Sequence, residues 1–184
     1  TGGTGLVGTG IKSIASEFPE YHISYMSSKD CDLLDYDDVL EYFWKNEPEC
    51  IIHLAANVGG LYKNMNQKVE MFDDNIQMNL NVIKAAFSND IKNLIGTLST
   101  CIFPDNTTYP INETMLHDGA PHTSNDAYAY AKRGQVLLAE EMSKLYPEIK
   151  FVSAHPGKNV SLHAYSNMLI LLHTYVIYLA SLKM

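Results

Sequence analysis

Three side chains in the second half of the sequence have the types and spacing to deliver a proton to a carbonyl oxygen. Tyr128 and Lys132 are four residues apart in "DAYAYAKR", a predicted helix, so they share a face that Tyr130 does not share. A phenol with a pKa of about 10 exchanges protons poorly at neutral pH, and an ammonium one helical turn away would stabilise its anion. Ser99 ends the preceding predicted strand and could hydrogen-bond the substrate oxygen. On its own, the Tyr and Lys pair is equally compatible with an ordinary helix surface.

A glycine-rich segment at the start of the sequence has the spacing of a dinucleotide-binding loop. "GGTGLVG" contains both GxGxxG, with Gly3, Gly5 and Gly8, and GxxGxxG, with Gly2, Gly5 and Gly8. Without Cβ atoms the backbone can turn tightly and approach a pyrophosphate, which then meets the amides of the following helix. The alternative is a glycine-rich loop that binds nothing. The expected binding loop comprises Gly2, Gly3, Thr4, Gly5, Leu6, Val7 and Gly8.

The segment "SSKDCDL", residues 27–33, indicates which dinucleotide is bound. An acidic residue after the second strand would accept hydrogen bonds from the ribose 2′-hydroxyl of NAD. Ser28 and Lys29 come first here, and a hydroxyl and an ammonium suit a 2′-phosphate. For Asp30 we prefer a role in a solvated turn. NADP is therefore favoured over NAD.

Apolar runs alternate with amphipathic stretches along the chain, which places these segments in a fold. Strands are expected at 22–26, 49–56, 91–100 and 150–156, and helices at 36–46, 69–87 and 126–146. Continuous apolar strands that alternate with helices predict an α/β fold, a Rossmann-like doubly wound parallel sheet with helices on both faces. Ligands bind at the carboxyl ends of such strands. That rule adds Asp32, Leu33, Leu54, Ala55 and Ala56 to the cofactor-binding set, and Lys132, on the helix, could hold the nicotinamide ribose.

The composition of the chain limits the kinds of partner and site that it can have. The net charge of −8 argues against a nucleic acid or an anionic membrane as the main partner. Cys31, Cys50 and Cys101 have no CxxC spacing and no histidine cluster, so neither a disulfide framework nor a metal site is expected. The cysteines fit a reducing compartment, and we expect the cytoplasm. His53, inside an apolar strand, is interpreted as a hydrogen-bonded core histidine.

The combination of motifs resembles a known family. The glycine loop, Ser99 and Tyr128-xxx-Lys132 look like the extended short-chain dehydrogenase/reductase superfamily. "HLAANVGGLYKNM", "SSKDCDL" and "LSTCIFPDNTTYPINETMLHDGAPHTSNDAYAYAKR" resemble the GDP-L-fucose synthase family more narrowly, up to about Arg133. This resemblance implies epimerisation and NADPH-dependent reduction of GDP-4-keto-6-deoxy-D-mannose. It makes Ser99, Tyr128 and Lys132 a reductase triad, with Tyr128 as the proton donor.

The resemblance also implies a base and an acid for the epimerisation. Cys101, two residues after Ser99, occupies the position of the family's base, although the residues alone favour a small buried hydrophobe. The acid is a histidine beyond Pro156, where this sequence departs from the family pattern. An alignment anchored on Asn159 brings His173 to the acid's position; the alternative is an unrelated histidine on an apolar face.

The ends of the sequence add further expectations. Because the glycines begin at Thr1 with no strand before them, we expect an incomplete NADP-binding domain over 1–158. Residues 159–184 are expected to be a divergent apolar tail in place of most of the substrate domain. The apolar stretch 168–182 is shorter than the ~20 residues that cross a bilayer, so no membrane anchor is expected. A GDP-sugar and a second copy of the chain, as a homodimer, are the partners considered.

Two other functions stay open at this stage. One is a different nucleotide-sugar epimerase or dehydratase of the same superfamily, which would keep its cofactor bound and consume no NADPH. The other is a non-catalytic dinucleotide-binding protein.

Overall fold

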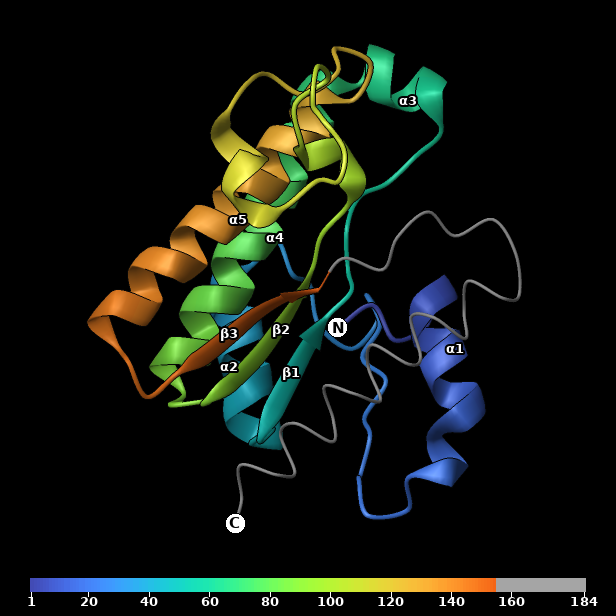
Figure 1. The fold of residues 1–184 in the computed structure, drawn as a ribbon. Coiled ribbons are helices and arrows are strands. Elements are labelled where there is room, and N and C mark those ends of the chain that lie inside the picture. The colour runs from blue at the N-terminus through green and yellow to red at the C-terminus, as the bar shows by residue number, and fades with distance from the viewer. Residues whose placement is uncertain (155–184) are drawn as a thin grey trace.

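A computed structural model describes residues 1–154 and shows a parallel three-stranded sheet at the centre of the molecule (Figure 1). The strands are β1 (Cys50–His53), β2 (Asn93–Thr97) and β3 (Lys150–Ala154). They lie in the order β1-β2-β3, with Ile51 opposite Leu94 and Leu94 opposite Phe151. All the pairs are parallel, as the continuous apolar runs predict. The α/β fold is confirmed.

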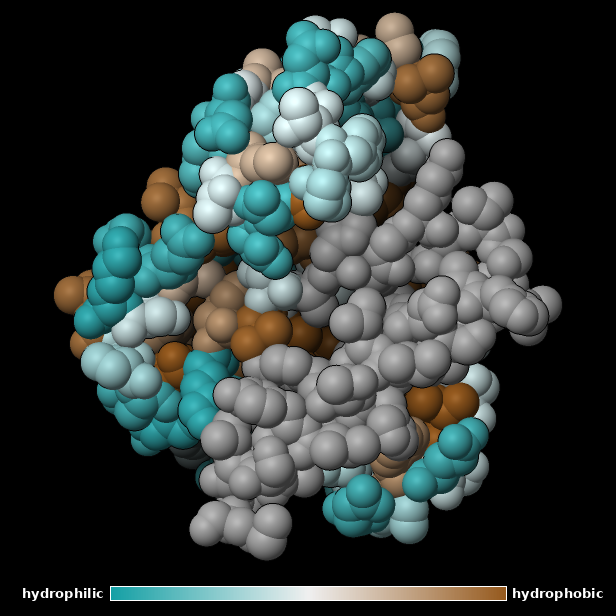
Figure 2. Space-filling model, viewed as in Figure 1, coloured by the Kyte–Doolittle hydropathy of each residue, from teal (hydrophilic) through white to brown (hydrophobic). Residues whose placement is uncertain are grey.

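Helices cover the sheet from both sides. Figure 1 shows α2, α4 and α5 together on one side and α1 on the other. The α-helices are α1 (Leu6–Ile14), α2 (Tyr36–Asn46), α3 (Leu61–Asn66), α4 (Lys68–Ser88) and α5 (Asp126–Leu145). Short 3-10 turns are η1 (Ala15–Glu17), η2 (Thr100–Ile102) and η3 (Glu113–His117). Figure 2 shows hydrophilic side chains over the outer side of α5, with hydrophobic ones in smaller patches.

Helix α2 begins and ends where its sequence dictates. The Asp35 side chain accepts hydrogen bonds from the amides of Asp37 and Asp38, which caps the start. Glu47 adopts the left-handed conformation, with φ at 42°, and ends the helix. Between these points Val39 and Phe43 face inward and are buried. The expected bounds 36–46 are confirmed.

The main core fills the space between the sheet and α2 and α4. Its fully or nearly buried side chains come from α2, β1, α4, β2 and the loops that precede α2 and β2. They are Met26, Cys31, Leu33, Val39, Phe43, Ile51, Val82, Ile83, Ala85, Ala86, Ile91 and Leu94. Burial of this apolar surface holds the carboxyl ends of β1 and β2 side by side.

The strand expected at 22–26 is wrong, because these residues form no regular strand. Their neighbour is the short segment Thr1–Gly3, which lies between them and β1. The Gly3 amide donates to the Met26 carbonyl at 2.8 Å, and the Leu54 amide donates to Thr1 at 3.3 Å. A strand assignment needs a ladder of hydrogen bonds, and three residues are too few to provide one.

Helix α3 was not predicted. Its apolar side chains Leu61, Tyr62 and Met65 are all exposed, so they do not produce the pattern of an amphipathic core helix. Within residues 1–154 we find no helix with the length and apolarity needed to cross a membrane. The expected tail 159–184 lies outside the described residues.

Candidate active site

Segments that follow β1 and β2 meet α5 at the carboxyl edge of the sheet. There Ser99, Cys101 and Tyr128 line one cavity of about 220 Å³. Ser99 is the residue before η2, and this tight turn brings Cys101 back beside it. The remaining lining residues are Val58, Gly59, Asn64, Met71 and Asn125. The structure thus brings together three of the four predicted catalytic residues of the described chain.

Tyr128, in the first turn of α5, keeps its proton at neutral pH. Burial, and then the negative charge that Cys101 carries when ionised, raises its pKa to about 12. The net lowering of this pKa that the sequence predicts is not found in this structure, because burial dominates. Tyr130 is 45% exposed, and the Arg133 guanidinium lies 5.5 Å from its ring centre. It is a packed neighbour on another side of the helix, as its spacing predicts.

Lys132 is buried and does not line the cavity. Its side chain is 1% exposed, and burial lowers the pKa of its ammonium to about 8. The Lys132 Nζ donates to the Gln135 Oε1 at 3.0 Å. Gln135 is equally buried, and its Nε2 has no hydrogen-bond partner. A Cβ added at Gly96 would lie 2.1 Å from this Nε2, so a side chain there would displace the Gln135 amide from this position.

Sequence reasoning missed Gln135. The signal was present, because residues three apart on a helix are neighbours.

The Cys101 thiol has two neighbours that favour its ionised form. Burial raises its pKa, and this effect outweighs the Ser99 hydroxyl, which hydrogen-bonds it, and the positive charge of Lys132. The thiol is therefore protonated at neutral pH in this structure. Cys101 is half-buried, so its side chain is packed and also forms part of the cavity wall, which fits both interpretations from the sequence.

The glycine loop has the tight geometry that its spacing predicts. Gly2 has φ at +68°, and a Cβ there would lie 2.7 Å from the Ala55 amide nitrogen. A Cβ on Gly3 would lie 2.6 Å from the Tyr25 Cα, and one on Gly8 would lie 2.4 Å from the Gly3 oxygen. Side chains at these positions would force the loop away from both neighbouring segments.

Helix α1 begins within this glycine-rich segment, at Leu6, and its first turn has free capacity to bind an anion. Gly5 is its N-cap and offers no side-chain cap, and the first turn holds no acidic residue. Thr4, Gly5 and Leu6 are exposed at this point, with Val7 half-buried. The unpaired amides and the positive end of the helix dipole make this terminus suitable for a phosphate. Leu54, Ala55 and Ala56 border it, since Gly2 lies directly against Ala55.

The turn 27–30 leaves Ser28 and Lys29 exposed. The Asp30 carboxylate accepts from the Ser27 amide at 2.8 Å and from its hydroxyl at 2.6 Å. The hydrogen bond from the hydroxyl is the main reason that the pKa of Asp30 is lowered, followed by the one from the amide. Asp30 is therefore a turn residue, as expected.

The next two predicted cofactor residues differ in their exposure. The Asp32 carboxylate accepts from the Leu34 amide at 3.0 Å. The Leu33 side chain is 8% exposed and belongs to the main core, so only its backbone can reach a ligand.

His53 is a core histidine, as predicted. It is fully buried, with Nδ1 2.7 Å from the Thr1 hydroxyl and Nε2 3.0 Å from the Asn79 Oδ1. Burial, followed by the charge of Lys132, holds its pKa well below the ordinary value. His173 lies outside the described residues. Residues 1–154 contain no group of three His, Cys, Asp or Glu that could hold a metal ion.

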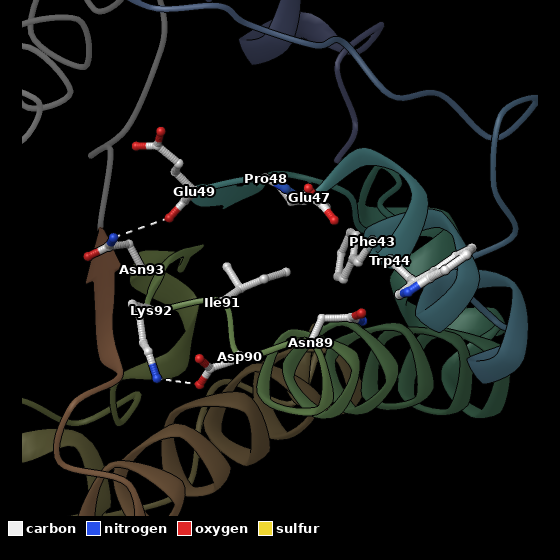
Figure 3. Close-up of a pocket in the computed structure, with 10 residues that line it drawn as sticks. All are labelled: Phe43, Trp44, Glu47, Pro48, Glu49, Asn89, Asp90, Ile91, Lys92 and Asn93. Atoms are coloured by element: carbon white, nitrogen blue, oxygen red, sulfur yellow. Dashed lines mark hydrogen bonds and ion pairs between the residues drawn. The ribbon is translucent and has the colours of Figure 1, made fainter.

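A larger pocket of about 450 Å³ lies at the other end of the strands (Figure 3). Figure 3 shows its lining at the end of α2 and at the starts of β1 and β2, with Lys92 paired to Asp90 and Asn93 to the Glu49 carbonyl. None of the predicted site residues reaches it. Because parallel sheets bind ligands at their carboxyl edge, we assign the site to the smaller cavity.

Comparison with known proteins agrees with this geometry. Residues 1–175 match the NAD dependent epimerase/dehydratase family. The chain belongs to this family. The match includes the glycine loop, the Ser99 and Cys101 turn and the Tyr128-xxx-Lys132 helix described above.

Individual relatives give a more specific similarity than the family does. The chain is 46% identical to GDP-L-fucose synthase of Dictyostelium discoideum over 161 residues, which is 85% of this chain and 49% of that protein. It is 45% identical to a probable GDP-L-fucose synthase of Drosophila melanogaster, over 72% of this chain and 42% of that one. The resemblance that the motifs indicate is thereby confirmed.

A solved structure gives the same result. The chain superposes on a GDP-L-fucose synthetase from Naegleria fowleri bound to NADP with a TM-score of 0.75 and 42% identity. This covers 84% of the chain and 48% of that protein. The chain thus spans about half the length of the relatives it matches.

Proposed function

We propose that this chain carries the cofactor site and the proton-transfer residues of an NADPH-dependent epimerase-reductase. The proposed reaction converts GDP-4-keto-6-deoxy-D-mannose to GDP-L-fucose. The observation that carries the proposal is the cavity shared by Ser99, Cys101 and Tyr128 at the carboxyl edge of the sheet. Its support is the similarity of the same segments to GDP-L-fucose synthases.

The loop and helix geometry fits a dinucleotide. Gly2, Gly3 and Gly8 let the backbone pack where a Cβ would clash, and α1 begins with uncapped amides. In our proposal residues 2–8 hold the pyrophosphate, and residues 54–56 line the same crevice. Ser28 and Lys29, exposed because Asp30 turns back onto Ser27, would hold a 2′-phosphate, which favours NADP over NAD. When bound, NADPH supplies a hydride.

Tyr128 would then donate a proton to the oxygen of the reduced ketone. Its raised pKa means that the proton is present at neutral pH before the reaction starts. Ser99 would hydrogen-bond the same oxygen while negative charge develops on it. Lys132 would hold the cofactor's ribose and oppose the charge left on Tyr128, because a cation stabilises a nearby anion in a dry site.

Cys101 is the proposed base of the epimerisation. A thiolate removes a proton from a carbon next to the ketone, and an acid returns one to the opposite face. The Ser99 hydroxyl and Lys132 both favour the thiolate. For the acid, His173 remains our prediction.

The proposed partners are a GDP-sugar and a second copy of the chain. Val69 and Phe72 of α4 and Leu137 of α5 are large apolar side chains exposed on neighbouring helices, which supports a homodimer. We propose a cytoplasmic location, which the three free cysteines of the described part support.

NADPH fluorescence titration of the chain, followed by an assay of NADPH oxidation with the keto sugar, tests the proposal. We expect Tyr128→Phe to bind NADPH like the parent and to lose oxidation. The matched control Tyr130→Phe, on another side of the same helix, should retain both. Oxidation at the parental rate by Tyr128→Phe would show that our role for Tyr128 is wrong.

The titration and the oxidation assay together separate the alternatives. An epimerase or dehydratase that keeps its cofactor would turn over without stoichiometric NADPH consumption. A non-catalytic binding protein would bind NADPH and leave the keto sugar unchanged. Failure to bind NADPH would contradict the proposed function and the non-catalytic binding function.

A further inference from the structure

Arg133, directly after Lys132 on α5, is a buried cation to which neither the motifs nor the proposed mechanism gives a role. It is 8% exposed. Its Nε donates to the Ile102 carbonyl at 2.6 Å, and its Nη1 donates to the Gly119 carbonyl at 2.9 Å. The guanidinium therefore joins α5 to two segments of the long loop between β2 and α5.

The first of these contacts lies next to the proposed epimerisation base. Ile102 is the last residue of η2, the turn that contains Cys101. Its side chain is 2% exposed and packs with Leu116 and Val136, and Cys101 lies against the same cluster. The turn is thus held by the apolar packing of the Ile102 side chain and by the hydrogen bond from Arg133 to the Ile102 carbonyl.

The chemistry of these contacts makes them specific. Burying a guanidinium is costly unless its N–H groups are hydrogen-bonded, and here both bonds go to backbone carbonyls. Nη2 is buried and has no hydrogen-bond partner. The side chain therefore leaves one donor unpaired in the position from which Nε and Nη1 reach the two carbonyls. A lysine has neither the planar fork nor the reach to replace both bonds.

We propose that Arg133 is a positioning residue for Cys101: through the Ile102 carbonyl it holds η2 so that the thiol faces Ser99 and Tyr128. The importance of this position for catalysis rests on the proposed function, but the position itself can be tested without turnover. One helix would then carry the proton donor of the reduction and the residue that orients the base of the epimerisation.

The test is alkylation of the whole chain with iodoacetamide over a range of pH, with each cysteine followed by peptide mass spectrometry. The variants are Arg133→Met, which removes both hydrogen bonds, and Arg133→Lys, which retains a cation. The control is Lys144→Met, which removes an exposed lysine, 67% accessible, from the same helix. Cys31, 3% exposed in the main core, reports unfolding in the same sample.

We expect Cys101 to react at least about tenfold faster in Arg133→Met, because loss of the charged hydrogen bond to the Ile102 carbonyl alone corresponds to about that factor or more. The midpoint of its pH profile should move down toward that of a free thiol, because the turn is no longer held in its buried position. Arg133→Lys should give a smaller change, and Lys144→Met none. Cys31 should stay protected throughout.

Two results would overturn the proposal. One is an unchanged Cys101 rate and pH profile in Arg133→Met while Cys31 remains protected. The other is labelling of Cys31 in Arg133→Lys, which would make Arg133 a requirement of the fold as a whole. Neither depends on NADPH oxidation, so failure of the proposed function would be seen separately in the keto-sugar assay.

Discussion

The buried ammonium of Lys132 should make the stability of this protein depend on pH in a predictable way. Burial lowers its pKa from 10.5 to about 8 in the folded chain. Below about pH 8 both folded and unfolded chains carry the charge, and the folded chain bears the full cost of burying it. Between about pH 8 and 10.5 only the unfolded chain holds the proton, so stability rises with pH.

The magnitude follows from these two values. Going from pH 7 to about pH 9.5 should relieve about 2 kcal/mol of this cost. Lys132→Met removes the titrating group and keeps a long side chain in the space. The free energy of unfolding of the parent, minus that of Lys132→Met, should therefore rise by about 2 kcal/mol over this range.

Urea unfolding followed by far-UV circular dichroism at several pH values measures this difference. The subtraction matters because burial raises the pKa of Cys31 and Cys50, and their ionisation in the unfolded chain lowers stability at high pH in both proteins. Loss of the hydrogen bond to Gln135 shifts the difference by the same amount at every pH. Lys144→Met, at an exposed position, should show no such rise. A difference that stays flat would refute the conclusion that Lys132 is buried as a cation.

Two further predictions concern the glycine loop and the core histidine. Gly8→Ala places a Cβ 2.4 Å from the Gly3 oxygen and should destabilise the chain by about 1–3 kcal/mol and abolish NADPH binding in the fluorescence titration. Gly60→Ala, where an added Cβ meets nothing within 4 Å, is the matched control and should bind normally; equal binding by both variants would contradict the packing argument. His53, whose pKa burial holds well below 6.5, stays neutral in the folded chain while the unfolded chain takes up a proton, so stability should fall as pH drops below about 6.5. In His53→Gln the urea midpoint should vary less between pH 7 and 5, and an equal dependence would show that another group is responsible.

Local features of the fold follow from the sequence because their causes are local. The bounds of α2 depend on the Asp35 cap and on Glu47, both of which are adjacent to the helix. The shared face of Tyr128 and Lys132, which Tyr130 does not share, follows from helical spacing alone. The parallel sheet follows from apolar strands that alternate with helices.

Two features of the fold did not follow from local sequence patterns. The segment 22–26 is no strand because its neighbour, Thr1–Gly3, is too short for a ladder. Helix α3 carries an exposed apolar surface that gives no core-facing pattern.

The sequence by itself determined which residue types stand at the carboxyl edge of the sheet and how the glycines, Ser99, Tyr128 and Lys132 are spaced. Only the tertiary structure decided the pKa values of these side chains and which residues hold them in position. Burial depends on the packing of elements far apart in the chain, and it raises the pKa of Tyr128 to about 12 where a neighbouring cation alone would lower it. The contact between Arg133 and Ile102 joins residues 31 positions apart, so no local pattern could reveal it.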